Sequence, residues 1–170
     1  MREKQSLRDF QTQLADKLKQ AEGANAVTSK LGFVAGGRSW LVNLDQVNEV
    51  VTVPGLTEAP WSRPWFVGVA SVRGALYGCT DLAAYLGIAE PMPVGESRLL
   101  LVHPRFGVNA AIRIERALGL RTLSDLTPIP LLQKTQPWEV AHWRAEDDQD
   151  WVEISMQALV SMPDFLEVGQ

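Results

Sequence analysis

The sequence is poor in the residues from which most metal and redox sites are built. Its 170 residues include one cysteine, Cys79, and two histidines, His103 and His142, which lie far apart. A single cysteine cannot form an internal disulfide, and two separated histidines do not make a metal-ligand cluster. The HExxH, GxSxG and GxxxxGK[ST] motifs are absent as well. We therefore expect no metal, no other cofactor and no catalytic activity.

The sequence also lacks an excess of positive charge and long apolar runs. The formal net charge is −4 and the pI is about 5.2. A protein with this net negative charge has no positive electrostatic field to attract nucleic acid or anionic lipid. No run is long enough to span a bilayer. The charged start, residues 1–5, has no apolar run behind it, so no signal peptide is visible. We expect a cytoplasmic protein without direct membrane insertion, built as one domain or two small subdomains.

The first 26 residues are predicted to form an amphipathic helix and a linker. Ser6 to Asp9 has the form of a capping box, and Gly23 supplies a stop. Between them, apolar residues recur at three- and four-residue spacing, which predicts a helix over Leu7–Ala21: Leu7, Phe10, Leu14 and Leu18. This stripe can pack on the protein's own domain or dock a partner. We expect packing on its own domain.

Most of the remaining chain has the period of two that is typical of β-strands. A hairpin is predicted from Lys30 to Leu44 around Gly36-Gly37, and a strand over 47–53 is followed by a loop to Pro64. Further strands are expected in two runs joined at Arg73-Gly74, in 98–102, in 107–114, and in a hairpin of 138–142 with 151–154. The leucines between 118 and 126 could be strand or loop anchors.

Two short helices are expected at the edge of this β-rich fold. Thr80 is the predicted N-cap of a helix that ends at Gly87, and Ser155 can cap a final helix that ends before Pro163. Many short strands with glycine and proline between them favour barrels or a sandwich over an α/β sheet. The predicted fold class is mainly β with peripheral helices.

Few side chains stand out as candidates for chemistry. Cys79 lies in an apolar strand run, so we expect it to be buried and unreactive. Glu49 is expected to face solvent from a strand, and Asp81 to complement a helix dipole. An enzyme or small-ligand domain using Glu49, Asp81 and Cys79 is the alternative. Trp61 and Trp65 are either core anchors or parts of a contact surface, since tryptophan is enriched in binding hot spots.

The order of the motifs resembles the CheW-like chemotaxis coupling proteins. It runs through residues 44–50, a proline-rich loop, the segment from Trp65 to Gly74, Asp81-Leu82, and residues 114–119. The resemblance covers about Leu31 to Leu166. Within that family, the N-terminal helix, residues 61–66 and residues 151–166 are similar to the PilI-type branch, which serves type IV pilus twitching motility.

This resemblance implies two intertwined, SH3-like, five-stranded β-barrel subdomains within residues 27–170. It also implies an adaptor that links the signalling tips of methyl-accepting chemotaxis receptors, at inner-membrane arrays, to the regulatory domain of a CheA-type histidine kinase. By motif position, the receptor would bind in a groove at Val47, Glu49, Gly68 and Val72, and Arg73 would orient or contact it. A CheW-like paralogue that sequesters receptor or kinase without activating it remains an alternative.

Overall fold

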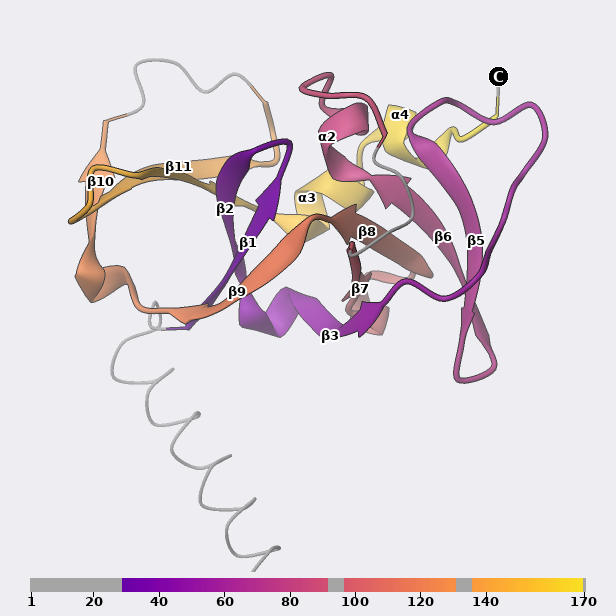
Figure 1. Ribbon diagram of the computed structural model, residues 1–170, viewed down its shortest axis with the longest axis horizontal. Coiled ribbons are helices and arrows are strands. Elements are labelled where there is room, and N and C mark those ends of the chain that lie inside the picture. The colour runs from indigo at the N-terminus through magenta and orange to yellow at the C-terminus, as the bar shows by residue number, and fades with distance from the viewer. Residues whose placement is uncertain (1–28, 92–96, 131–135, 170) are drawn as a thin grey trace, which may run out of the picture.

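A computed structural model describes residues 29–91, 97–130 and 136–169 of the chain. The predicted helix over Leu7–Ala21 lies outside these residues. The described chain forms two six-stranded sheets and several short helices (Figure 1). None of the helices in this part of the chain has the length and apolar character needed to cross a membrane.

The first sheet combines strands from the two ends of the described chain. Its order is β10-β11-β12-β2-β1-β9. The strands are β1 (Lys30–Ala35), β2 (Arg38–Asn43), β9 (Arg116–Arg121), β10 (Leu126–Ile129), β11 (Glu139–Ala145) and β12 (Asp150–Ile154). All pairs are antiparallel except β12 with β2, which is parallel.

The second sheet is built from one continuous stretch of chain between β2 and β9. Its order is β3-β7-β8-β6-β5-β4. The strands are β3 (Val47–Thr52), β4 (Leu56–Thr57), β5 (Phe66–Val72), β6 (Ala75–Asp81), β7 (Arg98–Val102) and β8 (Ala110–Ile114). Because the chain leaves the first sheet, completes the second and then returns, the two subdomains are intertwined.

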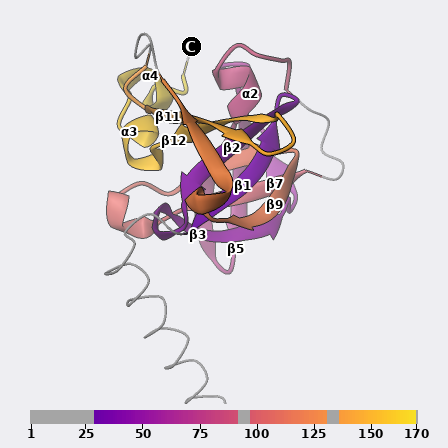
Figure 2. The ribbon, with the colours of Figure 1, turned by 90° about the vertical axis from the view of Figure 1, so that its left-hand side faces the viewer.

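The helices are short and lie beside the sheets. They are α2 (Leu82–Tyr85), α3 (Met156–Val160) and α4 (Pro163–Leu166), with single 3₁₀ turns at η1 (Leu44–Gln46), η2 (Pro104–Phe106) and η3 (Leu123–Asp125). Figure 2 looks at the molecule from the side of the first sheet, with the second sheet behind it. The predicted mainly β class is confirmed, although each sheet contains six strands where the resemblance implied five-stranded barrels.

The largest hydrophobic core is shared by both sheets and the C-terminal helices. Buried side chains of this shared core come from the two sheets, from α2 and from the C-terminal segment: Leu31, Phe33, Trp40, Val42, Leu82, Leu100, Val102, Ile112, Ile114, Ile154, Met156, Leu159 and Phe165. A smaller core inside the second sheet contains Ala70, Cys79, Leu99, Leu101 and Ala111. Because burial of apolar surface is the main favourable term in folding, the shared core joins the subdomains into one unit.

Local sequence signals predicted several elements correctly. Gly36 and Gly37 have φ values of 61° and 71° at the β1–β2 turn, which is the backbone a two-residue hairpin loop requires. The hairpin of β11 and β12 is also confirmed. Ser155 caps α3, because its side chain accepts a hydrogen bond from the Ala158 backbone N–H at 3.1 Å.

Other boundaries differ from the sequence predictions. Asp81, and not Thr80, is the N-cap of α2, because it directly precedes the helix and its side chain accepts a hydrogen bond from the Ala84 backbone N–H. The proline-rich loop contains the short strand β4, which pairs with β5. The leucine-rich segment after residue 118 forms β9, η3 and β10. Pro128 is tolerated in β10 because this strand lies at the edge of its sheet.

Candidate functional site

A two-residue turn at the end of the β5–β6 hairpin presents Arg73 to solvent. Val72 pairs with Ala75, so Arg73 and Gly74 are the two central residues of the turn. Their φ values are 52° and 82°, and turns with both central residues at positive φ match the right-handed twist of the flanking strands. The hairpin therefore fixes the backbone of Arg73, whose side chain is 75% exposed.

A bulge in β3 positions Glu49 opposite this turn. Val47 pairs with Val102 and Glu49 pairs with Leu101, so Asn48 is the extra residue. Residues i and i+2 of a regular strand share a face, and an inserted residue changes this relation. Val47 consequently packs in the shared core, whereas Val51, two residues after Glu49, packs against the smaller core. The bulge thus turns Glu49 away from the shared core.

Arg73 and Glu49 form a bidentate ion pair between two separate elements of the second sheet. Arg73 Nη1 donates to Glu49 Oε2 and Nη2 donates to Oε1, both at 2.5 Å. The Glu49 side chain is 28% exposed. An exposed pair of this kind contributes only about 0.2–1 kcal/mol to stability. Its main effect is geometric, because a two-point contact holds the guanidinium plane in one orientation.

The other three residues predicted for receptor binding lie in different surroundings. Val72 is half-buried and packs against the smaller core, directly before the turn. Val47 is only 8% exposed. Gly68 is buried at φ 131°, and a Cβ there would lie 2.5 Å from the Thr57 carbonyl oxygen. The structure thus brings Glu49, Val72 and Arg73 together, while Val47 and Gly68 occupy positions where packing dictates the residue.

Sequence reasoning missed two neighbouring features of this region. Leu76 is 62% exposed and pairs across the hairpin with Ser71, although an apolar residue in a strand run usually indicates core. Asp45 and Arg105 form an ion pair at 3.4 Å that connects η1 with η2. They lie 60 positions apart in the sequence, so no local pattern could have paired them.

The alternative catalytic set of Glu49, Asp81 and Cys79 is not assembled for chemistry. Burial raises the pKa of the Cys79 thiol from 9.0 to about 11, which keeps it protonated at neutral pH. Asp81 binds the Arg113 guanidinium and caps α2, and Glu49 is paired with Arg73. Within residues 29–91, 97–130 and 136–169, no three histidine, cysteine or acidic side chains are grouped as a metal ion would require.

Comparison with known proteins identifies the family. Residues 30–164 match the CheW-like domain. The chain belongs to the CheW-like family. It is 33% identical over 146 residues to Protein PilI of Pseudomonas aeruginosa, a match that covers 83% of this chain and 80% of that protein. The expected similarity to CheW-like proteins and to PilI is confirmed.

A solved structure supports the same fold. The crystal structure of the scaffolding protein TtCheW from Thermoanaerobacter tengcongensis superposes with a TM-score of 0.66. The match covers 81% of this chain and 94% of that chain, at 18% sequence identity. The CheW-like architecture is therefore retained despite extensive sequence divergence.

Proposed function

We propose that the protein is a non-catalytic adaptor, which couples the signalling tips of methyl-accepting chemotaxis receptors to the regulatory domain of a CheA-type histidine kinase. Membership of the CheW-like family supports this proposal. The similarity to PilI supports a role in a chemotaxis-like system that controls type IV pilus twitching motility. Such a protein would work in the cytoplasm, at receptor arrays of the inner membrane.

The observation that carries the receptor-binding part of the proposal is the ion pair of Arg73 with Glu49. A guanidinium has five N–H donors in a fixed plane, and the contact with Glu49 uses one donor from each of two nitrogens. The remaining donors of an exposed, oriented Arg73 suit a carboxylate or backbone carbonyls on the receptor's helical hairpin. Val72 lies next to this charge and adds a half-buried apolar neighbour.

Val47 and Gly68 support the same surface in a different way. Val47 anchors the start of β3 in the shared core, ahead of the bulge that directs Glu49. Gly68 allows β4 to approach β5, the first strand of the hairpin that carries Arg73. In this proposal, substitutions at these two positions reduce receptor binding by moving Glu49 or Arg73.

The experiment is a binding measurement between the full chain and a soluble receptor signalling-tip fragment. Arg73→Ala is expected to weaken binding by roughly 5- to 150-fold, the equivalent of a lost charge-assisted hydrogen bond. Arg144→Ala is a matched control, because Arg144 also forms an exposed pair with an acid, Asp150, but lies on the first sheet. The control variant should bind the receptor fragment as the unmodified chain does.

Two results would contradict the proposal. If Arg73→Ala and the unmodified chain bind the receptor fragment with equal affinity and melt at the same temperature, Arg73 has no role at the interface. An adaptor must bind both partners. If the full chain fails to bind the receptor fragment, or fails to bind a CheA-type kinase, the adaptor function is contradicted. Kinase activity in a mixture of all three proteins then separates activating coupling from sequestration.

A further inference from the structure

Trp61 is held on the surface in a backbone conformation that a bulky residue rarely adopts. Its side chain is 84% exposed and its φ is 62°. Such a value is unusual for a large aromatic residue and persists only where the surroundings impose it. The hydroxyl of Ser62 donates to the Ala59 carbonyl at 2.7 Å, and the Arg63 N–H donates to the Val168 carbonyl at 2.7 Å. These bonds fix the loop, so that Trp61 projects from it.

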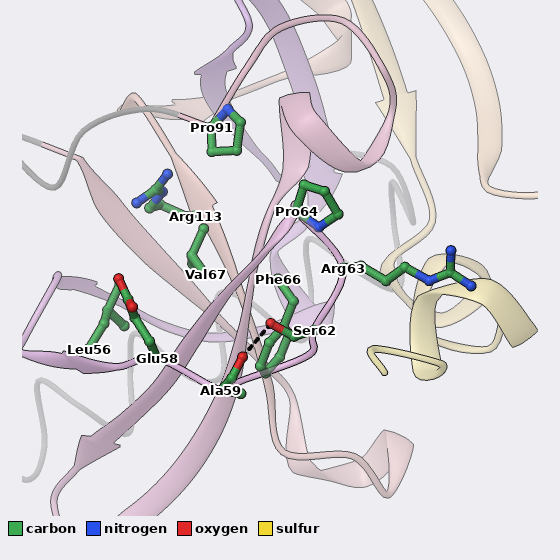
Figure 3. A pocket seen from close by; sticks show the side chains of 10 residues that line it. All are labelled: Leu56, Glu58, Ala59, Ser62, Arg63, Pro64, Phe66, Val67, Pro91 and Arg113. Atoms are coloured by element: carbon green, nitrogen blue, oxygen red, sulfur yellow. Dashed lines mark hydrogen bonds between the residues drawn. The ribbon is translucent and has the colours of Figure 1, made fainter. Parts of the chain in front are cut away.

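A pocket lies immediately beside this tryptophan. It has a volume of about 430 Å³. Its lining combines apolar side chains with charged ones: Leu56, Ala59, Phe66 and Val67, with Glu58, Arg63 and Arg113 (Figure 3). Trp61 is not part of this lining, although Ala59 and Ser62 on either side of it are. The size falls within the range of pockets that accept small organic groups. The loop thus carries a projecting aromatic side chain and, next to it, a cavity that could receive one.

The charged side chains of this loop can complement the same loop in a second copy of the protein. Glu58 lies three residues before Trp61 and Arg63 lies two residues after it, and both are exposed. In the described part of the chain, neither side chain forms an ion pair. If two copies of the loop run antiparallel about a two-fold axis between residues 60 and 61, each Glu58 faces the other copy's Arg63.

We propose that the protein forms a two-fold symmetric dimer, in which Trp61 of each copy enters the pocket of the other. A two-fold interface must be self-complementary, and a projecting residue beside its own cavity, flanked by opposite charges, meets that condition. Tryptophan and arginine are the residues most enriched at binding hot spots. The inference does not depend on the proposed receptor coupling.

The dimer would leave the candidate site open. Trp61 precedes β5 and Arg73 follows it, so the seven-residue strand separates the two by roughly 23 Å. A dimer would therefore present two Arg73 turns at once. If the adaptor function is correct, simultaneous contact with two receptor tips would raise the overall affinity without any new contact at either site.

Analytical ultracentrifugation of the full chain, over a concentration series up to about 1 mM, tests the proposal. The unmodified chain should change from monomer to dimer within this range. Trp61→Ala should raise the dimer dissociation constant by at least roughly tenfold. Leu120→Ala is the control, because Leu120 is another exposed large apolar residue, at 61%, and lies on β9 of the first sheet. This variant should dimerise as the unmodified chain does.

A charge reversal adds a test of the geometry. Glu58→Arg and Arg63→Glu should each weaken dimerisation, because each places like charges opposite one another across the axis. The double variant should restore it. A monomer at every concentration would overturn the proposal, as would a dimer unaffected by Trp61→Ala. If the double variant dimerises no more tightly than either single variant, the antiparallel arrangement of the loops is overturned. Melting curves for each variant exclude unfolding as the cause.

Discussion

Asp81 and Arg113 are direct cross-strand partners on the parallel strands β6 and β8, and one carboxylate joins three elements there. Asp81 Oδ2 accepts hydrogen bonds from Arg113 Nε at 3.0 Å and Nη2 at 2.8 Å. The other oxygen, Oδ1, accepts from the Ala84 backbone N–H at 3.0 Å and so caps α2. Both side chains are almost completely buried. The pair therefore fixes the start of α2 relative to the second sheet.

Replacement of Asp81 should be among the most destabilising substitutions in the protein. Asp81→Ala leaves the Arg113 charge without this partner and removes the cap, and we expect it to lower the free energy of unfolding by about 3–5 kcal/mol. Asp81→Asn retains an acceptor for the Ala84 N–H and should cost less. Denaturant unfolding measures both.

A matched aspartate provides the control for this measurement. Asp125 accepts a hydrogen bond from the Thr122 hydroxyl on the surface, so Asp125→Ala should change stability by less than about 0.5 kcal/mol. Equal effects of the alanine variants at 81 and 125 would show that the buried pair contributes little to stability.

Exchange of the two charges at the candidate site separates two roles of Arg73. Glu49→Arg and Arg73→Glu together can rebuild an ion pair with reversed direction, and the stability of the double variant should lie within about 1 kcal/mol of the unmodified chain. We expect binding to a receptor signalling-tip fragment to stay lost, because the exposed cation at the turn is gone. Titration with the fragment, alongside a melting curve, gives both quantities. Recovered binding would mean that Arg73 acts only by holding the hairpin.

Features with a local cause were predictable from the sequence. The Gly36-Gly37 turn, the Ser155 cap and the burial of Cys79 depend on residues a few positions apart, and each was predicted correctly. The N-cap of α2 was assigned to Thr80 because threonine is a good cap. Asp81 takes the position instead, because its Oδ1 accepts the Ala84 N–H and aspartate caps at least as well as threonine. Its Oδ2 binds Arg113, 32 residues away, a contact that no local pattern encodes.

The candidate site also combines a feature that the local sequence predicts with one that depends on distant residues. Arg73 could be placed on a turn from its neighbour Gly74, but its contact with Glu49 depends on a bulge in β3 and on the closeness of two strands that are not paired with each other. Glu49 was expected to face solvent as a lone acid and instead forms an ion pair. The contact between Arg73 and Glu49 is therefore set by the tertiary structure, and the local sequence pattern does not predict it.

Deletion of residues 1–22 tests the predicted N-terminal helix, which lies outside the described residues. An isolated helix of this length is marginal in water, so its stability should come from packing the stripe of Leu7, Phe10, Leu14 and Leu18 on the rest of the chain. We expect the truncated protein to melt at a lower temperature, because the deletion exposes the covered surface. An unchanged melting temperature, with loss of one partner in receptor or kinase pull-downs, would instead identify the helix as a docking element.

Cys79 should make the protein less stable at alkaline pH. Burial is the main cause that raises its pKa from 9.0 to about 11, so the folded state retains the thiol proton after the unfolded chain has released it. Stability from this source is complete below pH 9 and declines as the pH rises toward 11, by up to about 1.4 kcal/mol per pH unit. Denaturant unfolding at several pH values should show a smaller decline for Cys79→Ala than for the unmodified chain. Identical slopes for the two proteins, or rapid thiol labelling of the native protein at pH 7, would show that Cys79 is not held in a buried, protonated state.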